Sequence, residues 1–313
     1  MSGQAIGAVF PVSPASDRPG RRRRIGQLVT AYALSAPAVA LMVLLLIGPV
    51  IGVLLMSFTD WSLGDDGYAW VGTDNYAEML QDDVFAKAIV NTLIYVCIVV
   101  PGAVFLGLGA AMMIESLVVG RAFWRAVYFL PVMSTLIAMA IVWEFVLNDQ
   151  FGMLGIMLKM VGIDSPHWFT TAETALPALC GIAIWQAVGF NMVLFMAGLT
   201  AIPRDLRDAI EIDGAPTAWD RFWTVTWPLL SPVTMFVVVI TAIRSFQVFD
   251  TVHVLTKGGP DNASMVLVYL IYQEGFEFFR SSYAAALTVV FLIFIFAITL
   301  IKVFIIEKRV HYG

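Results

Sequence analysis

Long runs of apolar residues, separated by short polar segments, make up most of the chain. The six longest runs lie at residues 28–58, 86–115, 126–147, 175–201, 225–249 and 283–306. Each reaches the ~20 residues that a helix needs to cross a bilayer. We therefore predict an all-α, polytopic membrane protein with six transmembrane helices.

Composition agrees with this class and sets the N-terminal residues apart from the rest of the chain. Of its 313 residues, 60% are hydrophobic and only 13% are charged, which is too apolar for a soluble domain of this size. Residues 1–20 are rich in Ser, Pro, Gly and Ala and show no periodicity, which is typical of disorder. The run at 28–58 is far longer than the core of a signal peptide, so it is read as an uncleaved first span. We predict a disordered cytoplasmic tail at 1–27 and a six-span domain at 28–313.

The distribution of basic residues predicts the orientation. Five Lys or Arg precede the first span, two lie in the turn 121–125, three in the loop 202–224 and three at the C-terminus, so that 13 of 18 fall on one side. The segment 59–85 instead holds seven acids and no Lys or Arg. Because basic flanks remain in the cytoplasm, both termini and the loop 202–224 are predicted to be cytoplasmic.

The loop 202–224 is the longest polar insert on that side. Pro203 can end the preceding helix and start a new one, after which Leu206, Ala209 and Ile210 recur at helical spacing. Asp213-Gly214 then favours a helix stop, because Gly adopts the left-handed cap at little cost. A short amphipathic helix of this kind can rest on its own bundle, lie at the lipid interface or dock to a soluble partner.

Polar side chains inside the spans are costly and therefore indicate function or helix packing. The amides of Gln186, Asn191 and Gln247 offer both donors and acceptors, which suits a hydroxyl-rich ligand, and Trp185 could stack on a sugar face. The alternative is hydrogen bonding between helices, which is the favoured interpretation for two further polar residues, Asn91 and Glu115.

Arg244 has two interpretations. It can pair with Asp250, six residues further along the chain, or it can recognise an anionic group on the substrate. We count both residues with Trp185 and the three amides as candidate substrate-binding residues.

The sequence offers no catalytic or cofactor site. Gly258-Gly259-Pro260 lacks the Gly-Lys-Ser/Thr of a phosphate-binding loop, so ATP is not expected to bind this chain. The three histidines have no metal-ligand spacing, and nothing extends the four arginines 21–24 into a nucleic-acid site. The two cysteines lie in apolar runs and are interpreted as packing residues. We expect no metal, no cofactor and no nucleic-acid partner.

Five short motifs resemble one family. Residues 208–215 (DAIEIDGA), followed by Phe222, Pro228 and Pro232, resemble the EAA motif of binding-protein-dependent ABC importer permeases. Residues 70–76 resemble its F-x-G-L-x-N-Y, Asn91-Thr92 its N-T, residues 129–131 its Pro-bearing segment of the third span, and residues 255–260 its L-T-x-G-G-P. Within these permeases the chain is similar to the sugar family that includes the maltose and glycerol-3-phosphate permeases. The EAA match departs from the family at Asp208 (usually Glu), at Ile210 (usually Ala) and by one residue in the spacing from Gly to Pro.

This resemblance implies the fold and the assembly. It implies a type I ABC importer transmembrane domain in the bacterial inner membrane, without catalysis of its own. The implied partners are a second homologous permease, two ATPase subunits that bind ATP and Mg²⁺, an extracytoplasmic solute-binding protein at the acidic segments 59–85 and 250–280, membrane lipid and a sugar-like solute. It makes the helix at 204–215 the coupling helix that an ATPase grips, and it favours the spans flanking that helix as the sugar site. The residues implied in coupling are Arg204, Leu206, Asp208, Ala209, Ile210, Asp213, Gly214 and Ala215.

One rival function is an ion-coupled secondary transporter. That class would predict paired carboxylates in mid-membrane or an internal repeat of broken helices. The sequence shows neither pattern, so the importer is the preferred interpretation.

Overall fold

The computed structural model describes residues 21–203 and 217–301, all of whose regular secondary structure is helical. The chain divides into two compact units, Met1–Gly52 and Val53–Gly313. The first unit contains α1 (Arg21–Met42), the π-helical turn η1 (Val43–Ile47) and the start of α2 (Gly48–Met56). The second unit contains the rest of the described chain. The predicted coupling residues 204–215 lie outside the described residues, as do residues 1–20 of the predicted tail and residues 302–306 of the predicted last span.

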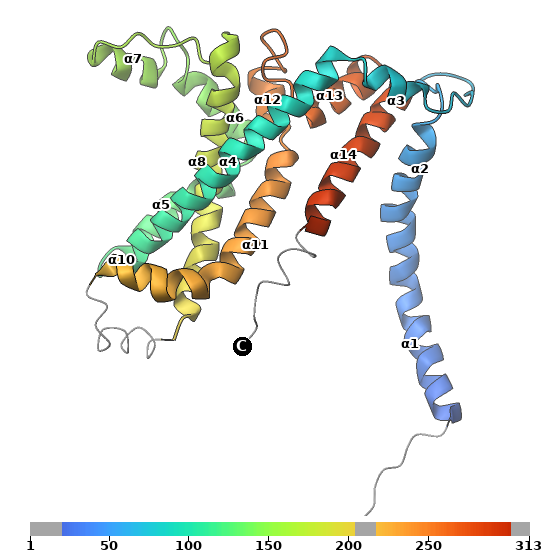
Figure 1. Cartoon of the computed structure of the whole chain (residues 1–313), viewed down its shortest axis with the longest axis horizontal. Helices are drawn as coiled ribbons and strands as arrows, with labels where there is room; N and C mark the ends of the chain where they lie inside the picture. The colour runs from blue at the N-terminus through green and yellow to red at the C-terminus, as the bar shows by residue number, and fades with distance from the viewer. Residues whose placement is uncertain (1–20, 204–216, 302–313) are drawn as a thin grey trace, which may run out of the picture. The chain divides into compact units, whose positions relative to one another are not determined.

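The second unit is a series of long helices joined by shorter ones (Figure 1). Its elements are α3 (Asp74–Met79), α4 (Asp83–Ser116), α5 (Arg121–Met133), α6 (Leu136–Val146), α7 (Met153–Met160), α8 (Ala172–Ala201), α10 (Ala218–Arg221), η2 (Phe222–Thr226), α11 (Trp227–Phe246), α12 (Asp250–Leu255), α13 (Leu267–Tyr272), η3 (Gln273–Glu277) and α14 (Ser281–Ile301). The short helices α3, α7, α12 and α13 gather at one end of the long ones, the α7 end, and α10 lies at the other.

The predicted spans are found, with one correction. Five helical stretches are long and apolar enough to cross a membrane: Leu28–Met56, Asp83–Ser116, Ala172–Ala201, Trp219–Leu255 and Ser281–Leu300. The third span, predicted as one helix at 126–147, is a pair of helices, α5 and α6, bent by 102° and counted as a sixth span only if the pair is taken together.

The bend in the third span has a local cause. Pro131 has no amide hydrogen to continue the hydrogen bonds of α5, and Ser134 and Thr135 are extended. Thr135 then starts α6, because its hydroxyl accepts a hydrogen bond from the Ala138 amide at 3.4 Å. The chain can therefore leave the first axis and begin a second within two residues.

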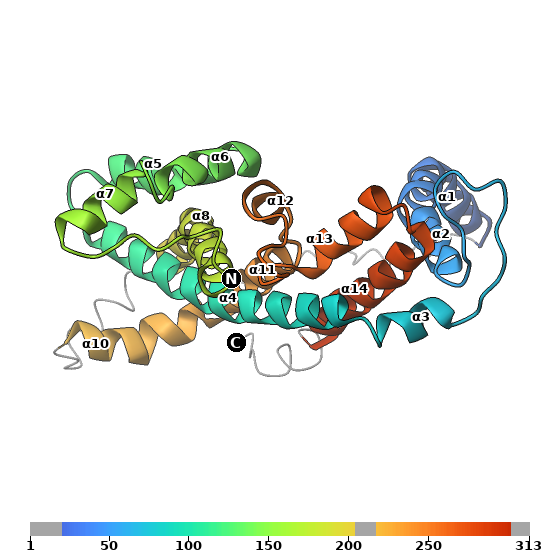
Figure 2. The same ribbon diagram turned by 90° about the horizontal axis from the view of Figure 1, so that it is seen from above.

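Close contact between α4 and α8 forms the centre of the unit. A Cβ at Gly102 would lie 2.7 Å from Ile184 Cδ1, and one at Gly107 would lie 2.7 Å from Asn191 Cβ. The absence of a side chain at these two positions therefore permits the close packing of α4 on α8. Viewed along the spans, α8 lies between α4 and the α5–α6 pair (Figure 2).

Two apolar clusters fill this framework. The cluster nearer the α7 end is built on fully buried side chains of α4, α8, α12, α13 and α14, among them Leu179, Val252, Tyr269, Leu270 and Leu287. The cluster nearer the α10 end joins α4, α8 and α11, among them Ala111, Met192, Phe195, Leu230 and Val237. Lipid tails are as apolar as these side chains, so it is their close packing, and not the hydrophobic effect, that fixes the relative register of the helices.

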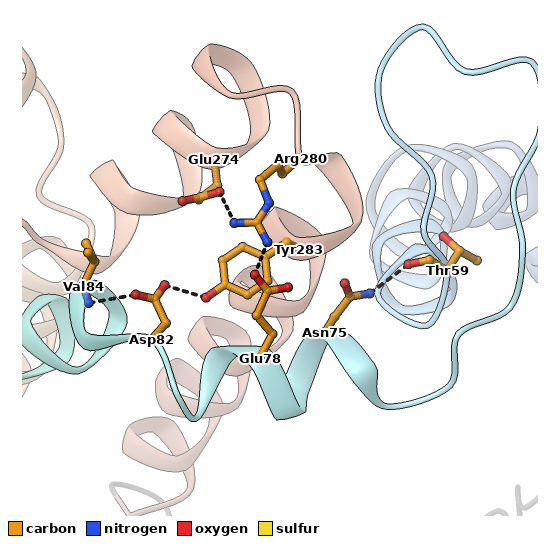
Figure 3. A network of polar contacts seen from close by, with 8 residues as sticks. All are labelled: Thr59, Asn75, Glu78, Asp82, Val84, Glu274, Arg280 and Tyr283. Carbon is orange, nitrogen blue, oxygen red and sulfur yellow. Dashed lines mark hydrogen bonds and ion pairs between the residues drawn. The ribbon is translucent and has the colours of Figure 1, made fainter.

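A polar network ties α3 to the start of α14 at the α7 end (Figure 3). Arg280 forms ion pairs with Glu78 of α3 and, at 3.2 Å, with Glu274. Tyr283 donates a hydrogen bond of 2.7 Å to Asp82, whose other oxygen accepts from the Val84 amide at 2.8 Å and so caps α4. Two acids of the segment 59–85 are thus internally paired and leave fewer free charges there for a partner than the sequence suggested.

Burial changes the acid–base properties of this network. Burial raises the pKa of the Glu274 carboxyl, and the charge of Arg280 opposes only part of that effect. Partial burial acts to lower the pKa of Arg280, but its hydrogen bond to Glu78 and the charge of Glu274 outweigh it, so that this pKa is raised. Arg280 therefore stays charged at any physiological pH.

Candidate functional site

A cavity of about 490 Å³ lies between the helices where two of them are broken. It is lined from α4, from the bend between α5 and α6, from the central part of α8, and from the end of α11 together with the residues that lead into α12. Its polar lining residues are Ser134, Gln186, Asn191, Thr241, Arg244, Ser245, Gln247, Asp250 and Thr251.

Helical spacing explains why these residues meet. On α8 the lining positions are 183, 186, 187, 190 and 191, and on α11 they are 241, 244 and 245. Both sets follow the i, i+3, i+4 spacing of a single helix face. α11 then stops at Phe246 and α12 begins at Asp250, which turns Gln247 and the residues after it toward the same space.

Breaks in spanning helices indicate what fills this space. Irregular backbone at membrane depth is tolerated only where it is buried in protein or lines a water-filled cavity, because lipid cannot satisfy its polar groups. The bend at Ser134 and the break after Phe246 both border the cavity. The exposed side chain of Arg244 would also be unfavourable against lipid, at about 2.5–3.5 kcal/mol on insertion scales. These features favour a compartment filled by water or solute over one filled by lipid.

Asn191 is the most buried polar residue of this lining. Its side chain is 1% exposed, and its Oδ1 accepts a hydrogen bond of 3.0 Å from the Thr241 hydroxyl. Its Nδ2 has no hydrogen-bond partner. Because Asn191 packs directly against Gly107, it has little freedom to turn that donor elsewhere.

The structure contradicts one of the two interpretations of Arg244, its pairing with Asp250. Its guanidinium carbon lies 4.1 Å from the centroid of the Phe190 ring, a cation–π contact. Among the residues that the structure describes it forms no ion pair, with Asp250 or any other acid, although Asp250 lines the same cavity. A continuous helix would not have paired them either, because residues six positions apart lie about 240° apart around the helix axis. The predicted pairing with Asp250 is thus wrong in this structure.

Five of the six predicted substrate-binding residues line this one cavity, and Trp185 does not. Trp185 packs edge to face against Trp143, with ring centroids 5.3 Å apart and planes at 82°. It lies one position before Gln186, and the 100° between successive helix residues turns it away from the lining face. Gln186 itself lies on the cavity face of α8.

The structure adds residues that sequence reasoning missed. Phe190 supplies the aromatic surface under Arg244, and Thr241 orients the Asn191 amide. Both could have been found by helical spacing, since Phe190 lies four residues after Gln186 and Thr241 three residues before Arg244. Asn91 has a structural role, as favoured, but it bonds a loop and not another helix: its amide donates to the carbonyls of Asn262 and Met265, each at 3.0 Å, between α12 and α13.

Comparison with known proteins gives these features a family context. Residues 84–312 match the family described as binding-protein-dependent transport system inner membrane component. The sn-glycerol-3-phosphate transport system permease protein UgpA of Agrobacterium fabrum is 30% identical over 292 residues, covering 91% of this chain and 97% of that protein. The sulfoquinovosyl glycerol transport system permease protein SmoG of the same organism is 30% identical over 286 residues, covering 91% and 92%.

Solved structures confirm the fold. A bacterial ABC transporter involved in the import of the acidic polysaccharide alginate has a chain that superposes with a TM-score of 0.78 at 23% identity, covering 91% of this chain and 99% of that one. Permeases of this family are multi-pass, non-catalytic subunits that work with a binding protein, a second permease and ATPase subunits. The chain belongs to the family of binding-protein-dependent transport system inner membrane components and is a permease subunit of an ABC importer.

Proposed function

We propose that a sugar or sugar-derivative solute crosses the membrane through the cavity lined by Gln186, Asn191 and Gln247. The main support is that candidate residues chosen from two separate spans meet in one cavity, beside the bend of the third span and the end of α11. The relatives transport glycerol-3-phosphate and sulfoquinovosyl glycerol by their names, which supports a small hydroxylated solute.

The chemistry of the lining suits such a solute. Gln186 and Gln247 each present a carbonyl acceptor and an amide donor, so either can follow a hydroxyl group as the solute turns. A transport site must bind weakly enough to release its cargo, and a few hydrogen bonds worth about 0.5–1.5 kcal/mol each meet that need. Tyr95, Val99 and Phe190 add apolar surface for the ring or carbon chain of the solute.

The orientation and the drive are part of the proposal. Basic residues on the α10 side favour both termini and the loop 202–224 in the cytoplasm, with the α7 end outside. The helix at 204–215 would then be the element gripped by an ATPase, through Arg204, Leu206, Asp208, Ala209, Ile210, Asp213, Gly214 and Ala215. Closure of the ATPase pair would be passed through this helix to α8 and α11, which flank it in sequence and carry most of the cavity lining.

Uptake measurements test the site. A strain lacking this chain, complemented with wild type or a variant, is assayed with a panel of radiolabelled sugars and polyols. Gln186→Ala and Gln247→Ala should each raise the solute concentration for half-maximal uptake about two- to twelvefold, the equivalent of one hydrogen bond.

The matched control is Gln150→Ala, since Gln150 is exposed and lies outside the cavity. It should leave uptake unchanged. Unaltered uptake in both cavity variants, with normal protein levels, would rule this cavity out as the passage.

A further inference from the structure

The cavity contains hydrogen-bond donors that the protein does not satisfy. Asn191 Nδ2 is buried without an acceptor, and a buried unpaired donor costs about 1–3 kcal/mol. The Arg244 guanidinium, whose five N–H groups are all donors, has only the Phe190 ring as a recorded partner among the described residues. A buried donor left free at such a cost, together with a guanidinium that has no acidic partner, points to a ligand rich in acceptors.

The orientation of the two groups makes them a built site. Thr241 donates to Asn191 Oδ1 at 3.0 Å, which fixes the amide oxygen and leaves its nitrogen as the free end. Phe190 holds the guanidinium carbon at 4.1 Å from its ring centroid. Residues 190 and 191 are adjacent on α8, while 241 and 244 are one turn apart on α11, so both groups belong to the same pair of helix faces.

Asp250 is the other charged group of the cavity lining. It forms no ion pair with Arg244, so the positive charge is not neutralised within 4.0 Å by an acid of the described chain. A carboxylate is an acceptor only and suits the hydroxyl groups of a solute. The cavity therefore combines a donor-only part, at Arg244 and Asn191, with an acceptor at Asp250.

We infer that the solute is a sugar or polyol carrying one oxyanion group (a carboxylate, phosphate or sulfonate) which Arg244 and Asn191 bind while Asp250 accepts from its hydroxyls. This inference rests on the proposed function of the cavity and specifies the chemical class of its cargo. A neutral sugar could satisfy Asn191 but would leave Arg244 without a counter-charge. Charge-assisted hydrogen bonds are about twice as strong as neutral ones, so the oxyanion should dominate selectivity.

Binding to the complete importer tests the inference. The complex of this chain with its second permease and ATPase subunits is placed in lipid nanodiscs and titrated with two matched pairs of radiolabelled probes: glucuronate with glucose, and sn-glycerol 3-phosphate with glycerol. At least one anionic probe should bind at least tenfold more tightly than its neutral counterpart.

Substitutions at Arg244 test whether this residue causes the preference for the anionic probe. Arg244→Gln should weaken the anionic probe at least ten times more than the neutral one, and Arg244→Lys should restore part of the preference because it keeps the charge. Lys159→Gln, which removes a positive charge from α7 outside the cavity, is the matched control and should change neither.

Different results would contradict the oxyanion site and the passage of solute through the cavity. Failure of both anionic probes to bind more tightly than their neutral counterparts, or equal weakening of both members of a pair by Arg244→Gln, would overturn the oxyanion site. If Gln186→Ala still lowers uptake, the passage itself stands. If neither Gln186→Ala nor Arg244→Gln affects binding or uptake, both fail.

Discussion

Gly189 provides the sharpest test of how the helices meet beside the cavity. It lies on α8 opposite α5, and a Cβ built on it would be 2.0 Å from the Tyr128 carbonyl oxygen and 3.0 Å from Val132 Cγ2. Ordinary contacts begin near 3.4 Å, so Gly189→Ala requires α5 and α8 to separate by about 1.4 Å. The obstacle is backbone, which cannot rotate away as a side chain can.

The same helix offers a matched control at Gly181, where a Cβ would meet nothing within 4 Å. Replacing Gly by Ala in a helix gains up to about 1 kcal/mol from propensity, and this gain is common to both sites. Overpacking costs about 1–3 kcal/mol, and contact with backbone places Gly189→Ala at the upper end of that range. The two variants should therefore differ by about 3 kcal/mol in stability.

Thermal unfolding of the purified complete importer measures this difference. The midpoint for Gly189→Ala should fall on the order of 5–10 °C below that of Gly181→Ala. Uptake should fall as well, because the separation occurs next to Phe190 and Asn191, which line the cavity. Midpoints within about 1 °C of each other would refute the close approach of α5 and α8 on which the cavity geometry depends.

Three further predictions concern the network at the α7 end and the coupling loop. Burial raises the pKa of Glu274, so the folded state binds a proton at this carboxyl more readily than the unfolded state does. The free energy of unfolding should therefore fall as the pH rises from the ordinary carboxyl pKa of 4.5 toward the raised value. Glu274→Gln should flatten that slope in unfolding curves measured across this range. Tyr283→Phe removes the 2.7 Å hydrogen bond to Asp82 and should lower the free energy of unfolding by about 0.5–1.5 kcal/mol. Tyr272→Phe is the control, because the Tyr272 hydroxyl has no recorded partner among the described residues, and it should lower the free energy of unfolding by less in the same assay. Gly214→Asp, in the turn of the EAA-like motif, should release the ATPase subunits on purification; a variant that still co-purifies with them at wild-type ratio would argue against that loop as the coupling element.

Local patterns made the spans predictable. Apolar runs of bilayer length identified five helical stretches and the bent sixth. Pro131 stands next to the bend of the third span, but sequence spacing does not give the size of that bend.

Contacts between distant elements were harder to foresee. Arg244 was assigned a nearby acid as one of two partners, and its ring partner Phe190 lies on another helix, 54 positions earlier. Glu78 and Asp82 were interpreted as free acids of an outer loop, because nothing local reveals Arg280 and Tyr283 some 200 residues further on. Which face of a helix meets which neighbour is set by the whole packing, and this is why the sequence did not reveal that Trp185 packs on Trp143 while Gln186 lines the cavity.

The central claim is that the cavity is a hydrated part of the transport path. It is tested most directly by thiol labelling at position 247, with Cys97 and Cys180 replaced by Ser and Gln247→Cys introduced. In the complete importer this cysteine should react with a charged, water-soluble methanethiosulfonate, at a rate that changes when the ATPases are trapped with orthovanadate. Val193→Cys, at an exposed apolar position of α8 outside the cavity, should stay unreactive. Equal and unchanging reactivity at the two positions, or none at position 247 in either state, would contradict the account.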